Sequence, residues 1–185
     1  AICWIFTPLF VHRLGREKKE KPLDSGEREF LLRRAAEIWR YFRENCTAES
    51  HYLPPDNVQL SPPASSAGRT SPTNIAMALA GALSALELGI ASETEALTLC
   101  EEILETVEGL GKWKGHLYNW YDTKTLRPLD PAYVSTVDSG NLAAALVAIA
   151  AGLTAHGAPT LAKRARAIAA AMDFRALYDE KRRLF

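Results

Sequence analysis

The fold is decided by residues 71–89, SPTNIAMALAGALSALELG. Ser71 is a favoured N-cap and Pro72 suits the first helical position, so we expect a helix from Pro72 to Leu88, with Gly89 as its stop. This helix carries apolar residues on nearly every side, and a helix without a polar face must be buried. The stretch therefore predicts a core helix.

The helices predicted on either side of this core helix are amphipathic. One begins at Asp24 or Ser25 and runs to about Asn45, and the other follows the capping box Ser92-Glu-Thr-Glu95. Each has one apolar and one charged face, which is typical of an outer layer. On the first of these helices, the residues expected to line the apolar face are Leu31, Ala35, Ile38 and Phe42.

The same order recurs along the chain. A second apolar helix, from about Gly140 to Ala155, follows a polar and aromatic segment, and a basic amphipathic helix follows from about Pro159 to Met172. The two apolar helices share a pattern, Asn74-Ile-Ala-x-Ala-Leu79 and Asn141-Leu-Ala-x-Ala-Leu146. Alternating inner and outer helices predict an all-α fold, part of an α/α barrel, which is a toroid of helical hairpins.

Composition fits one ordinary globular domain. The chain has 185 residues, 48% hydrophobic and 24% charged. Lys plus Arg and Asp plus Glu both number 22, and this balance disfavours a nucleic-acid partner, because nucleic acids are bound through a net positive field. Cys3, Cys46 and Cys100 form no C-x-x-C pair, so we expect buried thiols in a reducing compartment and no cysteine-based zinc site.

The N-terminal residues are apolar and a basic run follows them. Eleven residues, AICWIFTPLFV, are too few to span a bilayer, which needs about 20. The apolar-then-basic order nevertheless fits the end of a transmembrane helix on the cytoplasmic side, although an amphipathic terminus packed on the domain is the alternative. We predict the end of this helix at residues 1–12, a basic linker at 13–24, and a truncated helical domain at 25–185.

Two polar segments, Arg69–Asn74 and His116–Asn141, each lead into an apolar helix. Exposed helix N-termini present unpaired N–H groups that can hold hydroxyls or anions. The second segment places flat rings beside short planar polar groups, the combination that binds the C–H faces and hydroxyls of sugars. The predicted substrate-binding residues are Arg69, Thr73, Asn74, His116, Asn119, Trp120, Tyr121, Ser139 and Asn141. The alternative for the first segment is structural: Thr73 and Asn74 fill the first helical turn and Arg69 pairs with a carboxylate. The alternative for the second is an aromatic loop core that includes Trp120, with His116 as a structural hydrogen-bonding residue.

The candidate catalytic residues are Asp138 and Asp122, because glycoside chemistry uses two carboxylates across the scissile bond. For each an alternative stays open. Asp138 could cap the second apolar helix, although Ser135, Thr136 or Ser139 could serve there instead. Asp122 could form a turn. No second histidine stands at metal-ligand spacing from His116, so we predict no metal site, and no phosphate-binding loop is present.

Several motifs together resemble the central region of bacterial cyclic β-1,2-glucan synthases. They are Leu53-Pro-Pro-Asp-Asn57, Arg69-Thr-Ser-Pro-Thr-Asn-Ile75, His116-Leu-Tyr-Asn-Trp-Tyr-Asp-Thr-Lys-Thr-Leu126, Tyr133-Val-Ser-Thr-Val-Asp-Ser-Gly-Asn-Leu142 and Leu177-Tyr-Asp-Glu-Lys-Arg-Arg-Leu-Phe185. The resemblance implies the start of a glucoamylase-like (α/α)6 domain. That domain is similar to endo-β-1,2-glucanases and is thought to cyclise the glucan by transglycosylation.

The resemblance also implies partners and a location. In this family a membrane glycosyltransferase unit that uses UDP-glucose precedes the glucoamylase-like domain, so we expect no cofactor within this chain. We expect β-1,2-glucan, the membrane and the rest of the parent polypeptide as partners, on the cytoplasmic side of the bacterial inner membrane. The family's catalytic residues find no residue-by-residue match here, so the isolated chain is expected to be inactive. The alternative is a non-catalytic helical module that binds a glycan or a protein.

Overall fold

The structure, a computed structural model, describes residues 6–7, 11, 22–62 and 65–184. The chain divides into two compact units, residues 1–32 and residues 33–185. The predicted end of a transmembrane helix at 1–12 and the basic linker at 13–24 fall almost wholly outside the described residues. The division into these segments therefore stays a prediction.

Helix α2 (Ser25–Asn45) begins in the first unit and ends in the second. Its start is held by a reciprocal pair of hydrogen bonds. Glu27 N donates to Asp24 Oδ1 at 2.8 Å, and Asp24 N donates to Glu27 Oε2 at 2.9 Å. These bonds satisfy backbone donors that a helix terminus leaves unpaired. The helix predicted to begin at Asp24 or Ser25 and to end near Asn45 is confirmed.

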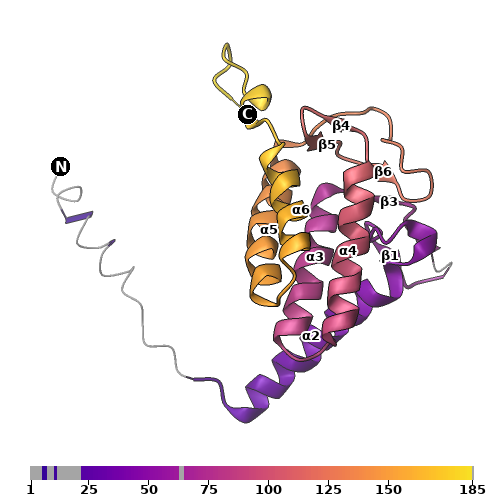
Figure 1. Ribbon diagram of the computed structural model, residues 1–185, viewed down its shortest axis with the longest axis vertical. Coiled ribbons are helices and arrows are strands. Elements are labelled where there is room, and N and C mark those ends of the chain that lie inside the picture. Colours follow the sequence, from indigo (N-terminus) through magenta and orange to yellow (C-terminus); the bar gives the residue numbers. More distant parts are fainter. Residues whose placement is uncertain (1–5, 8–10, 12–21, 63–64, 185) are drawn as a thin grey trace. The chain divides into compact units, whose positions relative to one another are not determined.

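The second unit is built on four further α-helices, which lie side by side in Figure 1. They are α3 (Pro72–Glu87), α4 (Glu93–Gly109), α5 (Thr136–Ala155) and α6 (Pro159–Ala170). The two apolar helices α3 and α5 contact each other, α4 packs on α3, and α6 packs on α5. The predicted alternation of inner and outer helices is confirmed. Short 3-10 helices follow α2 and α6, namely η1 (Ala48–Ser50) and η2 (Phe174–Leu177).

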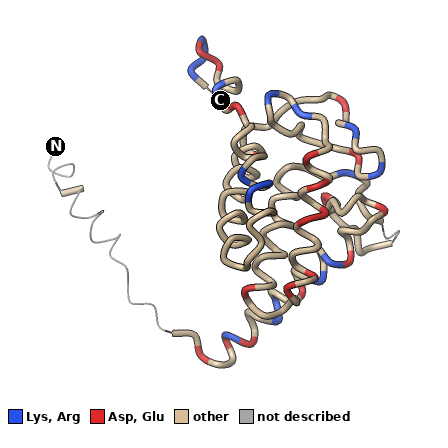
Figure 2. Tube along the Cα trace, in the orientation of Figure 1, with Lys and Arg blue, Asp and Glu red and all other residues tan. Residues whose placement is uncertain are grey.

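The predicted caps set where α3 and α4 begin. Ser71 Oγ accepts a hydrogen bond from Asn74 N at 3.2 Å, with Pro72 in the first turn of α3. Ser92 and Glu95 form the capping box of α4. Charged residues are carried by α4 and α6 more than by α3 and α5 (Figure 2). Between the two outer helices, Arg164 of α6 donates two hydrogen bonds of 2.9 Å to the Glu108 carboxylate of α4.

The apolar helices are not buried on every side, which corrects the sequence prediction. Met77 of α3 is 56% exposed and Val147 of α5 is 62% exposed. Met77, Val147 and also Val137 of α5 stay exposed to solvent, and we call these exposed apolar side chains the open stripe. Helix α5 is long and apolar enough to cross a membrane, but its buried side chains pack in the core beside α3 and α6. We interpret α5 as a core helix.

The core-facing side of α2 also differs from the prediction. Trp39 and Phe42 are its buried residues, whereas Ile38, expected toward the core, is more than half exposed. A tryptophan one position along from the predicted stripe buries more surface than an isoleucine, so packing rotates the buried face toward Trp39.

The predicted burial of the cysteines is confirmed for the two thiols within the described residues, whereas the reducing compartment stays a prediction. Cys46 and Cys100 are free and buried, and burial raises the pKa of each to about 12. Such thiols stay protonated and unreactive at neutral pH. Cys3 lies outside the described residues.

Three pairs of two-residue strands lie in the segments between the helices. The pairs are β1 (Val58–Gln59) with β2 (Ser65–Ser66), β3 (Arg69–Thr70) with β6 (Tyr121–Asp122), and β4 (Lys112–Trp113) with β5 (His116–Leu117), all antiparallel. The pairing of β3 with β6 joins parts of the chain that are some fifty residues apart. It brings the two predicted polar segments side by side.

Candidate functional site

The candidate site includes the β3–β6 pair, and strand β3 ends just before α3 begins. Arg69 lies opposite Asp122 and Thr70 lies opposite Tyr121, and Thr123 N donates to Gly68 O at 3.0 Å beyond the pair. The first turn of α3 follows immediately. The second polar segment therefore runs alongside the N-terminus of α3 before it reaches α5.

Asp138 lies inside the first turn of α5 and is not its cap. Ser135 is the N-cap, since its Oγ accepts from Asp138 N at 3.2 Å, so the capping alternative for Asp138 is wrong. The Asp138 carboxylate instead contacts α3, where Thr73 Oγ1 donates to its Oδ1 at 2.6 Å. Asn141 Nδ2 in turn donates to Thr73 Oγ1 at 3.0 Å. The structure thus brings Thr73, Asp138 and Asn141 together from the two inner helices.

Asn119 holds the other oxygen of Asp138. With the amide oriented to satisfy its neighbours, Asn119 Nδ2 donates to Asp138 Oδ2 at 3.1 Å, while its Oδ1 accepts from Tyr133 OH at 2.8 Å and from Trp120 Nε1. The backbone adds a bond from Asn119 N to Tyr133 O, also 2.8 Å. Asn119 is buried and bonds three neighbouring side chains, so it positions them. Each oxygen of the Asp138 carboxylate therefore accepts one hydrogen bond and has a second lone pair that can accept another.

Arg69 lies over the indole ring of Trp120, with its Cζ 4.3 Å from the ring centroid. This cation–π contact covers one face of the ring that was predicted to stack on sugar. The guanidinium also pairs with Asp56, to whose Oδ2 its Nη2 donates at 2.9 Å. Arg69 thus links the Trp120 ring to a carboxylate from the preceding loop.

Asp56 is a site residue that sequence reasoning missed. Its Oδ1 accepts from Asn74 Nδ2 at 3.4 Å, so Asp56 and Asp138 contact neighbouring residues of the first turn of α3. Burial alone raises the pKa of Asp56, but hydrogen bonds from Arg69 and Asn74 and the Arg69 charge outweigh it and hold the pKa below its usual range. Its signal in the sequence was the motif Leu53-Pro-Pro-Asp-Asn57.

Three predicted substrate-binding residues lie in the interior and not on the surface. His116 is 0% exposed and its ring meets Phe174 edge-on, with the centroids 4.9 Å apart. Tyr121 is also fully buried, and its hydroxyl donates to Gly111 O at 2.6 Å. Burial of Ser139 likewise removes it from contact with a ligand. These three side chains pack the core beneath the site, and we leave them out of the proposed contacts.

Asp122 stabilises a turn. Its Oδ1 accepts from Thr125 N at 2.7 Å, from Thr125 Oγ1 at 3.0 Å and from Lys124 N at 3.0 Å. The bonds from Thr125 are the main cause of a pKa below the usual range of an aspartate. An aspartate that bonds backbone N–H groups two and three residues ahead is typical of an Asx turn. The turn alternative therefore accounts for Asp122 without a catalytic role.

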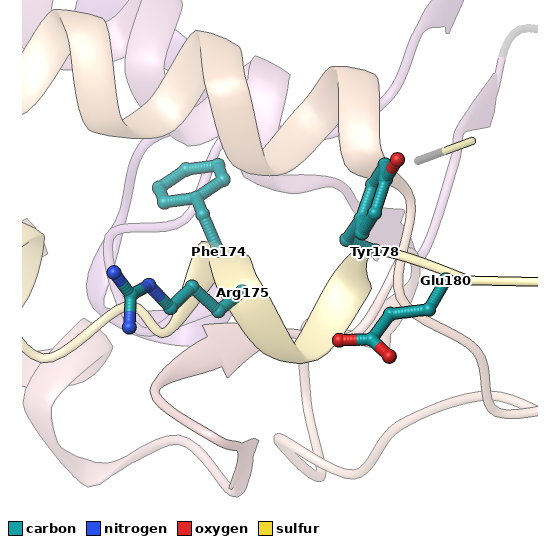
Figure 3. A pocket seen from close by; sticks show the side chains of 4 residues that line it. All are labelled: Phe174, Arg175, Tyr178 and Glu180. Carbon is teal, nitrogen blue, oxygen red and sulfur yellow. The ribbon is translucent and has the colours of Figure 1, made fainter. Parts of the chain in front are cut away.

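A separate cavity of about 500 Å³ lies beside η2, where the rings of Phe174 and Tyr178 project to the same side (Figure 3). Arg175 and Glu180 complete its lining, and it contains none of the predicted site residues. Among the described residues, no three His, Cys, Asp or Glu side chains gather as a metal site. The candidate site is therefore the polar rim formed by Asp56, Arg69, Thr73, Asn74, Asn119, Trp120, Asp138 and Asn141, which we call the rim.

Sequence comparison places the chain in a family without an assigned function. The family described as "Protein of unknown function (DUF3131)" matches residues 33–182. The chain is also 40% identical over 152 residues to the protein named cyclic beta-(1,2)-glucan synthase NdvB of Rhizobium meliloti (strain 1021). That match covers 80% of this chain but only 5% of the relative's length. The resemblance predicted from the motifs is confirmed.

Solved structures share the fold. A putative glucoamylase from Bacteroides fragilis NCTC 9343 superposes with a TM-score of 0.68 at 17% identity, over 83% of this chain and 37% of its own. An endo-beta-1,2-glucanase from Chitinophaga pinensis, in complex with sophorotriose and glucose, gives 0.62 at 14% identity, over 76% of this chain and 35% of its own. At such identities the likeness shows the fold alone. It confirms the predicted fold class, a part of a helical-hairpin toroid.

Proposed function

We propose that this chain, which belongs to the DUF3131 family, is the glucan-binding part of a glycoside-hydrolase-like domain in a larger cyclic β-1,2-glucan synthase. The kinship with a protein named as such a synthase and the fold shared with an endo-β-1,2-glucanase support a β-1,2-glucan as the ligand. The observation that carries the proposal is the rim itself. In it, Asp138 is held at one oxygen from α3 and at the other from the second polar segment.

The rim offers the groups by which sugar hydroxyls are bound. Each Asp138 oxygen can accept a further hydrogen bond, and the exposed Asn141 amide keeps an N–H that Thr73 does not use. Arg69 is about half exposed and has donors beyond those that bond Asp56. Sugar hydroxyls both donate and accept, so they can satisfy carboxylate and amide together. In this proposal Thr73, like Asn119, orients polar groups that contact the glucan.

Asp138 is the acid of the rim best placed to act on a reacting group. Asp56 is held in an ion pair with Arg69 and bonded by Asn74, so we assign it to holding the rim. Glycoside chemistry needs a second carboxylate, and Asp138 is the one rim acid outside an ion pair among the described residues. We therefore propose that the isolated chain binds glucan without turnover. In the whole parent, the domain would break one β-1,2 linkage of a linear glucan and release the part on its reducing-end side as the leaving group. The freed anomeric carbon would then bond to a hydroxyl oxygen at the other end of the same glucan chain, which closes the ring.

The same proposal extends to location and partners. The N-terminal apolar segment would attach the parent polypeptide to the bacterial inner membrane, with this region on the cytoplasmic side. UDP-glucose would be the donor for a separate glycosyltransferase unit of the parent, and this chain itself would need no cofactor. The rest of the parent polypeptide would be the protein partner of the open stripe on α3 and α5.

Product analysis of the parent enzyme tests the catalytic part of the proposal. Asp138→Asn keeps the shape of the side chain and removes its charge. We expect the yield of cyclic glucan to fall about 100-fold or more, which is the usual contribution of a general acid or base to the rate. Asp130→Asn, at an exposed loop position, is the matched control and should leave the products unchanged. Unaltered linear and cyclic products from Asp138→Asn would remove Asp138 from the reaction.

A non-catalytic glycan-binding module is the second candidate function. The observation that favours it is that the described rim has a single acid outside an ion pair. Glucan binding by the parent that is lost in Asp138→Asn, together with product formation that is not, would support this module over a catalytic domain.

A further inference from the structure

We infer that Tyr133 is a further sugar-stacking platform of the rim, whose ring takes the apolar face of a glucose unit beside Asp138. This inference rests on the proposed function and names a contact that neither the motifs nor the comparisons assign. It begins from Asn119, whose side-chain amide bonds both the Tyr133 hydroxyl and the Asp138 carboxylate.

The Tyr133 side chain is exposed, and yet hydrogen bonds hold both its hydroxyl group and its backbone oxygen. Half of the residue is accessible to solvent. Its hydroxyl donates to Asn119 Oδ1 at 2.8 Å, and its backbone oxygen accepts from Asn119 N at 2.8 Å. Ordering a mobile side chain at an interface costs affinity, and a ring that is already held avoids much of that cost. An exposed, pre-ordered aromatic ring is what stacking on a sugar requires.

The other aromatic residues of the polar segments are less available. Tyr121, predicted to stack, is fully buried, and one face of Trp120 is covered by the Arg69 guanidinium at 4.3 Å. Tyr118 is only partly exposed and packs against Tyr121, with centroids 6.4 Å apart. Tyr133 is therefore the ring of these segments that presents the most open surface.

The hydrogen bond between the Tyr133 hydroxyl and Asn119, which we call the hydroxyl clamp, also places the Tyr133 ring close to Asp138. Because the Asn119 amide bonds both groups, a pyranose that stacks on Tyr133 lies near the Asp138 carboxylate. Asp138 can then accept hydrogen bonds from the hydroxyl groups of that sugar. The arrangement recognises a sugar by two features at once, an apolar C–H face and a neighbouring hydroxyl. A β-linked glucose unit, whose substituents lie mostly equatorial, offers both.

Calorimetric titration of the 185-residue chain with a linear β-1,2-gluco-oligosaccharide tests the inference. Tyr133→Ala removes the ring and should weaken binding about fivefold to tenfold, the effect of one aromatic contact. Tyr133→Phe keeps the ring and should remain within about threefold of wild type, since a single neutral hydrogen bond contributes modestly. Tyr178→Ala is the matched control, because Tyr178 is an exposed tyrosine of the η2 cavity. The affinity of this variant for the oligosaccharide should equal that of wild type.

The outcomes separate this inference from the function on which it rests. Wild-type affinity in Tyr133→Ala overturns the platform and leaves the proposed function standing, whereas no binding by wild type rejects both. Equal losses in Tyr133→Phe and Tyr133→Ala would show that the hydroxyl clamp matters and not the ring, which also overturns the platform. If Tyr133→Ala does not fold by circular dichroism, Tyr133→Leu, bulky but not flat, is measured instead and should bind about as weakly as expected for Ala.

Discussion

At the scale of single residues, Asp56 is the link between the loop before β3 and the first turn of α3. Its carboxylate accepts a hydrogen bond from Arg69 on one oxygen and from Asn74 on the other. Because Arg69 also covers Trp120, the charge of Asp56 orients a guanidinium, and the guanidinium orients an indole. The rim therefore depends on a carboxylate that we do not expect to touch the glucan.

The depressed pKa of Asp56 makes its contribution to stability depend on pH. A carboxyl group whose pKa is lower in the folded state stabilises the fold above its unfolded pKa, about 3.9, and loses this effect as pH falls through its folded pKa. We expect Asp56→Asn to lower the free energy of unfolding by about 1 kcal/mol at pH 7, since Arg69 is half exposed and solvent screens the pair.

Urea unfolding of wild type and Asp56→Asn at pH 7, 5 and 3 measures this dependence. The difference between the two proteins should be similar at pH 7 and 5 and should be clearly smaller at pH 3. The exposed Asp130→Asn serves again as control and should shift the midpoint little at any of these pH values. A difference that grows as the solution is acidified would contradict the assignment of Asp56 to an ion pair.

At the scale of elements, the β4–β5 hairpin shows how a turn is fitted to a helix end. Lys114 and Gly115 are its two central residues, with φ of 51° and 81°, the signs that a type I′ turn requires. A Cβ atom on Gly115 would overlap the backbone carbonyl of Ala171, just past α6. Only glycine combines that φ with so close an approach.

Gly115→Ala should therefore destabilise the chain by about 2 kcal/mol or more, because strain at positive φ and backbone overlap add. Gly111→Ala is the matched control, since a Cβ there meets no atom within 4 Å, and it should stay within about 0.5 kcal/mol of wild type. Denaturant midpoints of the three proteins give the comparison. Equal midpoints for the two variants would refute the close approach.

The elements differ in how far the sequence could predict them. Helix starts at Asp24, Ser71 and Ser92 were predictable because side-chain caps are local signals that satisfy backbone donors. The β3–β6 pair was not, because strands of two residues carry no periodicity and pair across some fifty positions. That pair and the hydrogen bonds of Thr73 with Asp138 and Asn141 join the two polar segments. The sequence therefore indicated the segments but not the way they meet.

The site residues follow the same physical division. Thr73, Asn74, Asp138 and Asn141 sit at helix starts, where residue type and position predict a polar group that solvent reaches at least in part. Ser139, in the same first turn of α5, is nevertheless buried. His116 and Tyr121 lie in strands of two residues, which are too short for an alternating pattern to tell inward-facing from outward-facing side chains, and both are buried. Asp56 lies beyond the predicted segments, and although it belongs to the motif at 53–57, its contacts with Arg69 and Asn74 are what show its part in the rim.

At the scale of the whole molecule, the open apolar stripe on α3 and α5 explains why their burial was overestimated. Met77, Val137 and Val147 are each more than half exposed. Solved proteins of this fold are longer, since the matched region is 37% of the glucoamylase chain. An apolar helix of one part of a toroid is expected to complete its burial against other parts, and exposed apolar stripes of this kind mark interaction surfaces.

The central claim for the whole molecule is that two distant segments form one glucan-binding rim. Nuclear magnetic resonance titration of the isotope-labelled 185-residue chain with a linear β-1,2-gluco-oligosaccharide tests it most directly. The claim predicts that the Trp120 indole N–H, the Arg69 Nε–H and the side-chain amides of Asn74 and Asn141 shift together along one binding curve, while signals of η2 stay in place. Shifts confined to η2, to one of the two segments, or absent altogether would contradict it.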